Sequence, residues 1–163
     1  MTLIGLCASS AATATAQEKP LRISLGYAYA DLLESGAGSA PEGGYLSLAW
    51  ATGKNGAELD LAYHRDSEKL LGQTFHLNTF TATIGPRVRI GDGRTQPYFH
   101  LLGGIRHDSF EGAGNTSFGA MAGTGADFPL TSSLFLRIGA DFQLWIDDGD
   151  NLKVLRLVGG VSF

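Results

Sequence analysis

Charged side chains at alternate positions are the residues of this sequence best suited to chemistry. Six arginines and four acids each lie in a segment whose alternate residues on the other parity carry no charge. Side chains two positions apart on a β-strand point to the same face, so these charges are expected to gather on one side of a sheet. They are Arg22, Glu58, Asp60, Arg87, Arg89, Arg106, Asp127, Arg137, Asp141 and Arg156.

The run His107-Asp108-Ser109, with Glu111 close by, is a second candidate. A His and a Ser two positions apart on one strand face, together with an acid, are the components of a hydrolytic triad. We favour an ordinary polar stretch at the start of a loop, because the pair has no further elements of a hydrolase site around it. The sequence predicts no cofactor or metal site. The other histidines, which lack metal-ligand spacing, are His64, His76 and His100.

Composition restricts the class of protein. The 163 residues suit one domain, and a net charge of −4 gives no basic surface for nucleic acid. Although 44% of residues are hydrophobic, no run approaches the roughly 18 apolar residues of a membrane helix. The 23 glycines favour many short strands and turns, and the single Cys7 excludes an internal disulfide.

The first residues are typical of a targeting segment. Residues 1–16 are apolar, then small, and carry no charge. Ala14 and Ala16 form the A-x-A pattern of a signal-peptidase site, which makes Gln17 the expected start of the mature chain. The sequence therefore predicts a signal peptide over 1–16 and a single exported domain over 17–163.

After the targeting segment the hydrophobic pattern has a period of two, which indicates strands. In each of eight segments one face carries no charge, and all strand charges fall on the other face beside Gly, Ala, Ser and Thr. A continuous, charge-free face with aromatic residues suits lipid contact, and a sheet in lipid must close on itself. The segments are 22–30, 45–51, 57–64, 79–89, 97–106, 118–128, 134–144 and 154–163.

The connections between these segments alternate in length. Short turn-forming links are expected at 52–55, 91–95 and 129–133. Short periplasmic turns and longer outer loops are typical of transmembrane barrels, so we expect both termini in the periplasm. The mostly longer, polar links are expected at about 32–43, 66–75, 107–115 and 146–151.

Two motifs stand out: "TATIGPRVRI" followed by "QPYFHLLGGI", and Phe163 at the end of an apolar strand face. In these motifs the sequence resembles the OmpA-like outer-membrane β-barrel domain family. The resemblance implies an eight-stranded antiparallel up-and-down barrel in the cell outer membrane. It also implies contact with outer-membrane lipid and lipopolysaccharide, and a terminal Phe163 that is read by the barrel-assembly machinery.

Three functions remain open at this stage. We favour a non-enzymatic protein with a structural or surface-interaction role, whose lumen charges form a buried plug of ion pairs. A narrow ion channel gated by the same salt bridges is the alternative, and a lipid A-modifying hydrolase at His107 is the third. The pairing of arginines with acids depends on barrel shear, which the sequence does not supply. Replacing a single lumen arginine, as in Arg137→Gln, is expected to leave assembly intact.

Overall fold

The structure is a computed structural model that describes residues 21–33, 42–70, 73–110, 113–147 and 150–163. The predicted signal peptide lies outside these residues. Within the described part, no α-helix has the length and apolar character needed to cross a bilayer.

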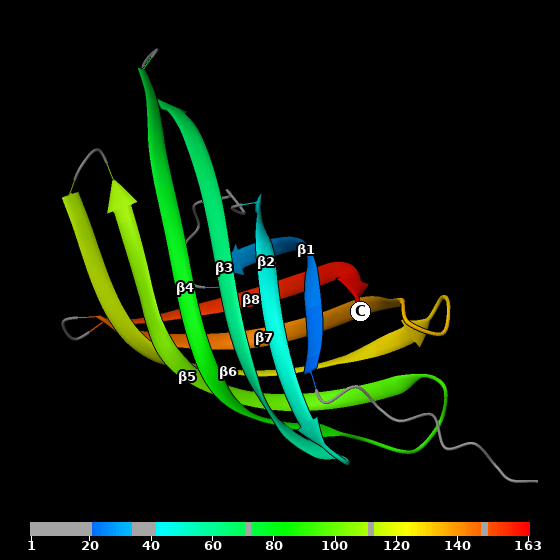
Figure 1. Cartoon of the computed structure of the whole chain (residues 1–163). Coiled ribbons are helices and arrows are strands. Elements are labelled where there is room, and N and C mark those ends of the chain that lie inside the picture. Colours follow the sequence, from blue (N-terminus) through cyan, green and yellow to red (C-terminus); the bar gives the residue numbers. More distant parts are fainter. Residues whose placement is uncertain (1–20, 34–41, 71–72, 111–112, 148–149) are drawn as a thin grey trace, which may run out of the picture.

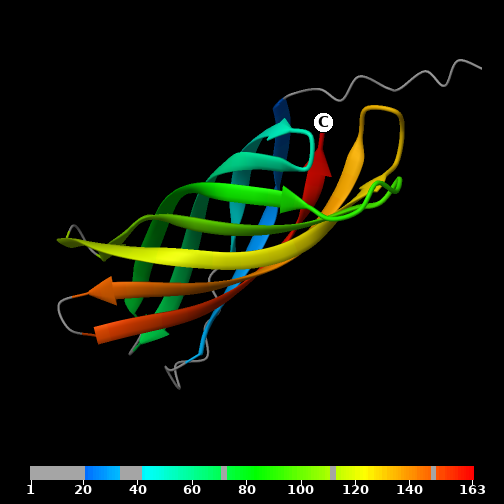
Figure 2. The same cartoon turned by 90° about the horizontal axis from the view of Figure 1, so that it is seen from below.

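Eight antiparallel strands form a closed barrel in which each strand pairs with its neighbours in sequence and the last pairs with the first (Figures 1 and 2). The predicted up-and-down barrel is therefore confirmed. The strands are β1 Leu21–Leu32, β2 Glu42–Thr52, β3 Asn55–Leu70, β4 Gln73–Arg89, β5 Gln96–Phe110, β6 Ala113–Pro129, β7 Phe135–Asp147 and β8 Asp150–Ser162.

The seam between β1 and β8 closes the barrel with a regular ladder that includes the pair Ser24 and Ser162. The hydroxyls of these two serines hydrogen-bond inside the lumen at 2.7 Å. Beside them Gly26 pairs with Gly160, and a Cβ on Gly26 would lie 2.2 Å from the backbone oxygen of Gly159. Glycine is needed here because the backbones approach too closely for any side chain.

Three tight links lie at one end of the barrel, together with the start of β1 and the end of β8 (Figure 2). We call this the turn end and the opposite end the hairpin end. Gly53 and Gly91 adopt φ values of +70° and +80°, in a region that favours glycine. The three short links predicted from the sequence are confirmed here.

At the hairpin end the strands are longer than the sequence pattern predicts. The structure continues β3 to Leu70 and resumes with β4 at Gln73, and β5 likewise reaches Phe110 before β6 begins at Ala113. The predicted loops 66–75, 107–115 and 146–151 were thus wrong over most of their length. An apolar–polar alternation marks a strand only where its two faces have different surroundings, so a strand with polar residues on both faces gives no such signal.

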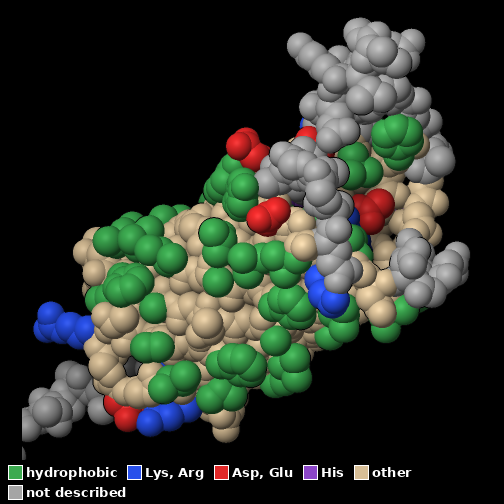
Figure 3. Space-filling view, turned by 180° about the vertical axis from the view of Figure 1, so that it is seen from behind, with side chains coloured by type: hydrophobic (Ala, Val, Ile, Leu, Met, Phe, Trp, Pro, Cys, Tyr) green, Lys and Arg blue, Asp and Glu red, His purple; other side chains and the backbone are tan. Residues whose placement is uncertain are grey.

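The outer face of the barrel is apolar and the inner face is polar, as the parity of the sequence predicts. Ile84 and Ile138 are 59% and 53% exposed, and Phe118 is 68% exposed. Apolar side chains cover the barrel wall, whereas charged side chains gather toward its two ends (Figure 3). A surface of this kind is stable against hydrocarbon, where each charge would be costly.

Candidate functional site: the charged lumen

Inward-facing residues from seven strands form a connected network of ion pairs inside the barrel. The alternation of each strand turns these side chains inward, and closure of the sheet brings residues far apart in sequence within hydrogen-bond distance. The members are Arg22, Glu58, Asp60, Arg87, His100, Asp127, Arg137, Asp141 and Arg156.

Asp127 on β6 is the meeting point of three guanidinium groups nearest the turn end. Arg22 from β1 donates to it at 2.9 Å, and Arg87 from β4 donates at 3.1 Å. Arg137 from β7 donates through Nε at 2.8 Å and through a second nitrogen at 3.2 Å. Asp127 is fully buried, so these charge-assisted bonds compensate the loss of its hydration.

Glu58 on β3 is the second shared acid. Arg87 and Arg137 each donate to it at 3.2 Å, and the hydroxyl of Ser47 donates to the same carboxylate. Arg87 and Arg137 are therefore held by the same two acids, Asp127 and Glu58. Two like charges brought so close repel each other, and this arrangement needs both carboxylates to be ionised.

Tyr98 on β5 places its ring against both of these guanidinium groups. The central carbon of Arg87 lies 3.8 Å from the ring centroid, and that of Arg137 lies 5.0 Å from it. The negative face of an aromatic ring attracts a cation, so Tyr98 adds to the stabilisation of the crowded charges. A Cβ on Gly125 would lie 2.6 Å from the Tyr98 hydroxyl, which explains a glycine at that position.

His100 on β5 joins two parts of the network. Its Nδ1 lies 3.0 Å from Glu58 and its Nε2 lies 2.9 Å from Asp141. Because an ionised carboxylate only accepts hydrogen bonds, both contacts are made together when both ring nitrogens carry protons. His100 then acts as a cationic bridge between the two carboxylates.

Arg156 on β8 completes the network on the side toward the hairpin end. It donates to Asp141 at 2.8 Å through Nε and to Asp60 at 2.7 Å. Its side chain is 1% exposed. A guanidinium buried to this degree requires such partners, because an unpaired charge in this position is strongly destabilising.

Beyond Arg156 the lumen is filled mainly by large uncharged side chains. Trp145 on β7 is fully buried and its Nε1 donates to Gln143 at 3.0 Å. Met121 and Leu102 are buried within the barrel as well. The described lumen thus changes from crowded ion pairs to tightly packed aromatic, amide and thioether groups along its axis.

Two of the arginines assigned to the lumen from the sequence lie apart from the central network. Arg106 pairs with Asp108 at 2.7 Å, and Thr79 hydrogen-bonds to the same acid. Arg89 lies at the turn end, where it lines a cavity that opens to the outside. The other eight assigned residues are brought together in the network.

The structure places the candidate triad residues on opposite faces of β5. Asp108 points to the lumen, where it binds Arg106, while the exposed His107 ring hydrogen-bonds Thr116 at 2.8 Å. Ser109 is paired across the sheet with Asn78 and Gly114. Glu111 lies outside the described residues. Asp108 is thus directed away from the His107 ring rather than toward it.

Sequence reasoning missed the roles of three residues. His100, Tyr98 and Trp145 all stand at inward parity on their strands, so the alternation contained the signal for their direction. It contained no signal for their partners, which come from other strands. Arg137 contacts two acids and donates to Ser47 at 3.2 Å, and the tolerance of Arg137→Gln during assembly stays a prediction.

Comparisons with known proteins agree with this architecture. Neisserial surface protein A superposes with a TM-score of 0.69 over 88% of this chain and 96% of its own, at 16% sequence identity. OprG of Pseudomonas aeruginosa gives 0.60 over 87% and 93%, at 15% identity. The Yersinia pestis attachment invasion locus protein Ail gives 0.56 over 88% and 97%, at 21% identity. Identities this low carry the fold alone.

No curated protein matches the chain in sequence. The family described as "outer membrane protein beta-barrel domain", in contrast, matches it over residues 1–163. Neither this family nor the three similar structures is described as an enzyme. The match spans the whole chain and agrees with the closed eight-stranded sheet, so the protein belongs to the outer-membrane β-barrel domain family.

Proposed function

We propose that this protein is an integral component of the cell outer membrane with a non-enzymatic, structural or surface-interaction role. The observation that carries the proposal is the pairing of an apolar outer wall with a lumen closed by ion pairs. The wall suits lipid, and the described side chains inside an eight-stranded barrel fill most of its interior. What remains available for interaction is the outer wall and the two ends.

The proposed orientation places the turn end in the periplasm and the hairpin end outside the cell. Short periplasmic turns are usual for such barrels, and the β3–β4 and β5–β6 hairpins would then project from the surface. Two similar barrels are described as a surface protein and an attachment protein. A comparable role for the projecting hairpins, among outer-membrane lipid and lipopolysaccharide, is our proposal for this chain.

We further propose that Phe163 takes part in recognition by the barrel-assembly machinery. Its side chain is 44% exposed, and its backbone pairs with Ile23 at 2.9 Å and 3.0 Å, so it lies at the seam between β1 and β8. Loss of this aromatic group in Phe163→Ala should slow assembly in cells and leave refolding in detergent unchanged. Equal effects in both settings would indicate a purely structural residue.

Membrane fractionation combined with a gel of unboiled and boiled protein tests the main proposal. The protein should fractionate with the outer membrane and run faster unboiled, because a closed barrel with every strand paired resists detergent until heated. A soluble periplasmic protein with a single mobility would contradict it. Mass spectra of lipid A that change on expression of the protein would instead favour a lipid-modifying enzyme.

A further inference from the structure

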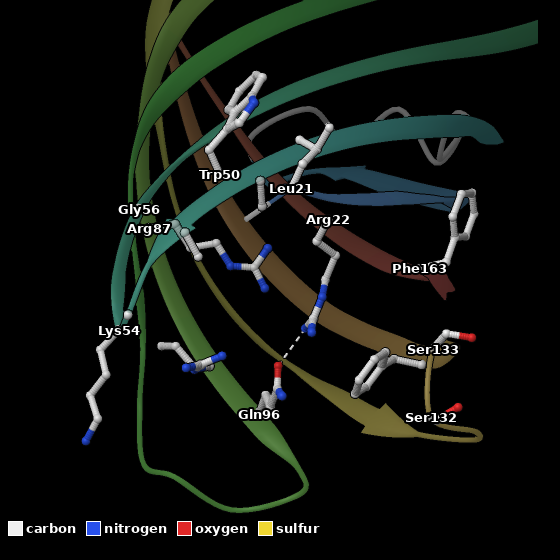
Figure 4. Close-up of a pocket in the computed structure, with 15 residues that line it drawn as sticks. Leu21, Arg22, Trp50, Lys54, Gly56, Arg87, Gln96, Ser132, Ser133 and Phe163 are labelled. Atoms are coloured by element: carbon white, nitrogen blue, oxygen red, sulfur yellow. Dashed lines mark hydrogen bonds between the residues drawn. The ribbon is translucent and has the colours of Figure 1, made fainter. Parts of the chain in front are cut away.

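The turn end of the barrel contains a cavity of about 320 Å³ that the ion-pair network does not fill (Figure 4). Four cationic side chains line it, and among the described residues no Asp or Glu does. Gln96, Ser132 and Ser133 add amide and hydroxyl groups that donate hydrogen bonds. The cationic residues are Arg22, Lys54, Arg87 and Arg89.

Nearby acids compensate only part of the charge at this cavity: Lys54 pairs with the exposed Asp92 at 2.8 Å. Arg22 and Arg87 bind Asp127 behind the cavity wall, and that carboxylate is already shared with Arg137. Arg22 directs one terminal nitrogen to both Asp127 and Gln96, and its side chain remains 24% exposed. A guanidinium carries five N–H donors, so this side chain has further donors to offer at the cavity.

The opening of the cavity is apolar on the side of the barrel wall. Leu21, Trp50 and Phe163 line it and are 37%, 43% and 44% exposed. Phe135 lies under the guanidinium of Arg22, whose central carbon is 4.3 Å from the ring centroid. The site therefore has a cationic floor inside the barrel and an apolar rim that continues into the lipid-facing wall, with Trp50 and Leu21 at its edge (Figure 4).

We propose that this cavity binds a phosphate group, and that the group is the headgroup of an anionic phospholipid in the adjacent membrane leaflet. A phosphate oxygen accepts from several guanidinium and hydroxyl donors at once, which matches the floor. The acyl chains would lie along the apolar rim. A free phosphate ester shares the headgroup chemistry but gains nothing from Leu21, Trp50 and Phe163.

Native mass spectrometry of the whole barrel in maltoside micelles tests the proposal with two probes. Dimyristoyl phosphatidylglycerol should remain bound, and glycerol 1-phosphate should bind much more weakly. Arg89→Gln should weaken lipid binding about tenfold, the typical effect of one charge-assisted contact. Arg94→Gln is the matched control, because it removes a charge from the same end of the barrel without lining the cavity.

The outcomes separate the sources of the phosphate group from failure of the site. Equal affinity for both probes would still support a phosphate site and would assign it to a soluble ester instead of a lipid. Binding of neither probe, or equal weakening by Arg89→Gln and Arg94→Gln, would overturn the proposal. The gel of unboiled and boiled protein shows whether each variant is folded. If Arg89→Gln does not assemble, Lys54→Gln replaces it, because Lys54 also lines the cavity.

Discussion

The two halves of the lumen hold their charges in opposite proportions. Toward the turn end, the guanidinium groups of Arg22, Arg87 and Arg137 share two carboxylates, Asp127 and Glu58. Toward the hairpin end, Arg156 is the one arginine of the described network, and it binds both Asp141 and Asp60. Within the described network, the part near the turn end therefore carries an excess of positive charge, and the part beyond His100 carries an excess of negative charge.

The contact that joins the halves is the ring of His100 between Glu58 and Asp141. Neither half is neutral alone, so the barrel interior is a single electrostatic unit rather than a row of independent salt bridges. The consequence of removing a charge therefore depends on the half from which it is removed. Within the described network, a surplus cation can be lost at modest cost, whereas Arg156, which two acids share, cannot.

The largest effect is expected for Arg156→Gln. This change leaves Asp60 without the ion-pair partner that the structure describes, and leaves Asp141 with His100 alone. Breaking a buried pair from one side costs about 3–5 kcal/mol. Urea unfolding in micelles, followed by tryptophan fluorescence, measures the loss in the free energy of unfolding.

Arg87→Gln is the matched control, because both of its acids keep Arg137 as a partner. Its cost should be well below that of Arg156→Gln. Adding Asp60→Asn to Arg156→Gln removes the orphaned charge and should recover part of the loss. Equal costs for Arg87→Gln and Arg156→Gln would mean that the halves do not differ in charge balance.

A charged residue on the outer wall of the barrel tests whether the fold tolerates charge there as it does in the lumen. Ile138 lies beside Arg137 on β7 but faces outward, with 53% of its surface exposed. Ile138→Arg should cost about 2–4 kcal/mol in the free energy of unfolding, because the cation would face hydrocarbon. The same unfolding assay in lipid vesicles gives the value.

Ile138→Ala serves as the control, since shortening a lipid-facing side chain creates no internal cavity and should have little effect. Good tolerance of Ile138→Arg together with a large loss for Ile138→Ala would place this side chain inside the barrel. The comparison of the two halves would then lose its basis.

A smaller effect is expected where the halves meet. A Cβ on Gly123 would lie 2.0 Å from Asp141 Oδ1 and 2.3 Å from His100 Nε2. Gly123→Ala should therefore push the two groups apart and cost about 1–3 kcal/mol, the usual range for overpacking. Gly159→Ala is the control, because a Cβ there meets nothing within 4 Å. If both variants unfold at the same urea concentration, the His100 contact does not couple the halves.

The alternation of apolar and polar residues predicts the strands and the direction of their side chains. It does not predict which side chains from different strands meet in the lumen. The period of two predicted eight strands and the inward direction of Arg137, Asp141 and Arg156. It did not predict that Arg156 meets Asp60, because those residues are 96 positions apart and lie on strands that are not neighbours. Such contacts depend on the stagger of the strands around the closed sheet.

The same limit explains why the bridging contacts of His100 were not predicted and why the hairpin end was predicted as loops. His100 was an isolated histidine in the sequence and became a bridge only when β3 and β7 supplied its carboxylates. The extension of β3 carries the polar run 65–69, in which no apolar residue alternates with a polar one. Sequence patterns report the environment of each strand face, and not the register that pairs the faces.

Conductance in a planar bilayer should show the smallest change of all. The wild-type barrel should give no large, steady pore, since an eight-stranded interior is filled by its own side chains. Trp145→Ala empties space only in the hairpin half, and the ion pairs of Arg137 and Arg156 still close the centre. Its conductance should therefore match the wild type, even though its free energy of unfolding falls.

Neutralising both acids that hold His100, in Glu58→Gln with Asp141→Asn, should instead give small, flickering currents. A steady, porin-sized conductance in the wild type would show that neither half closes the lumen.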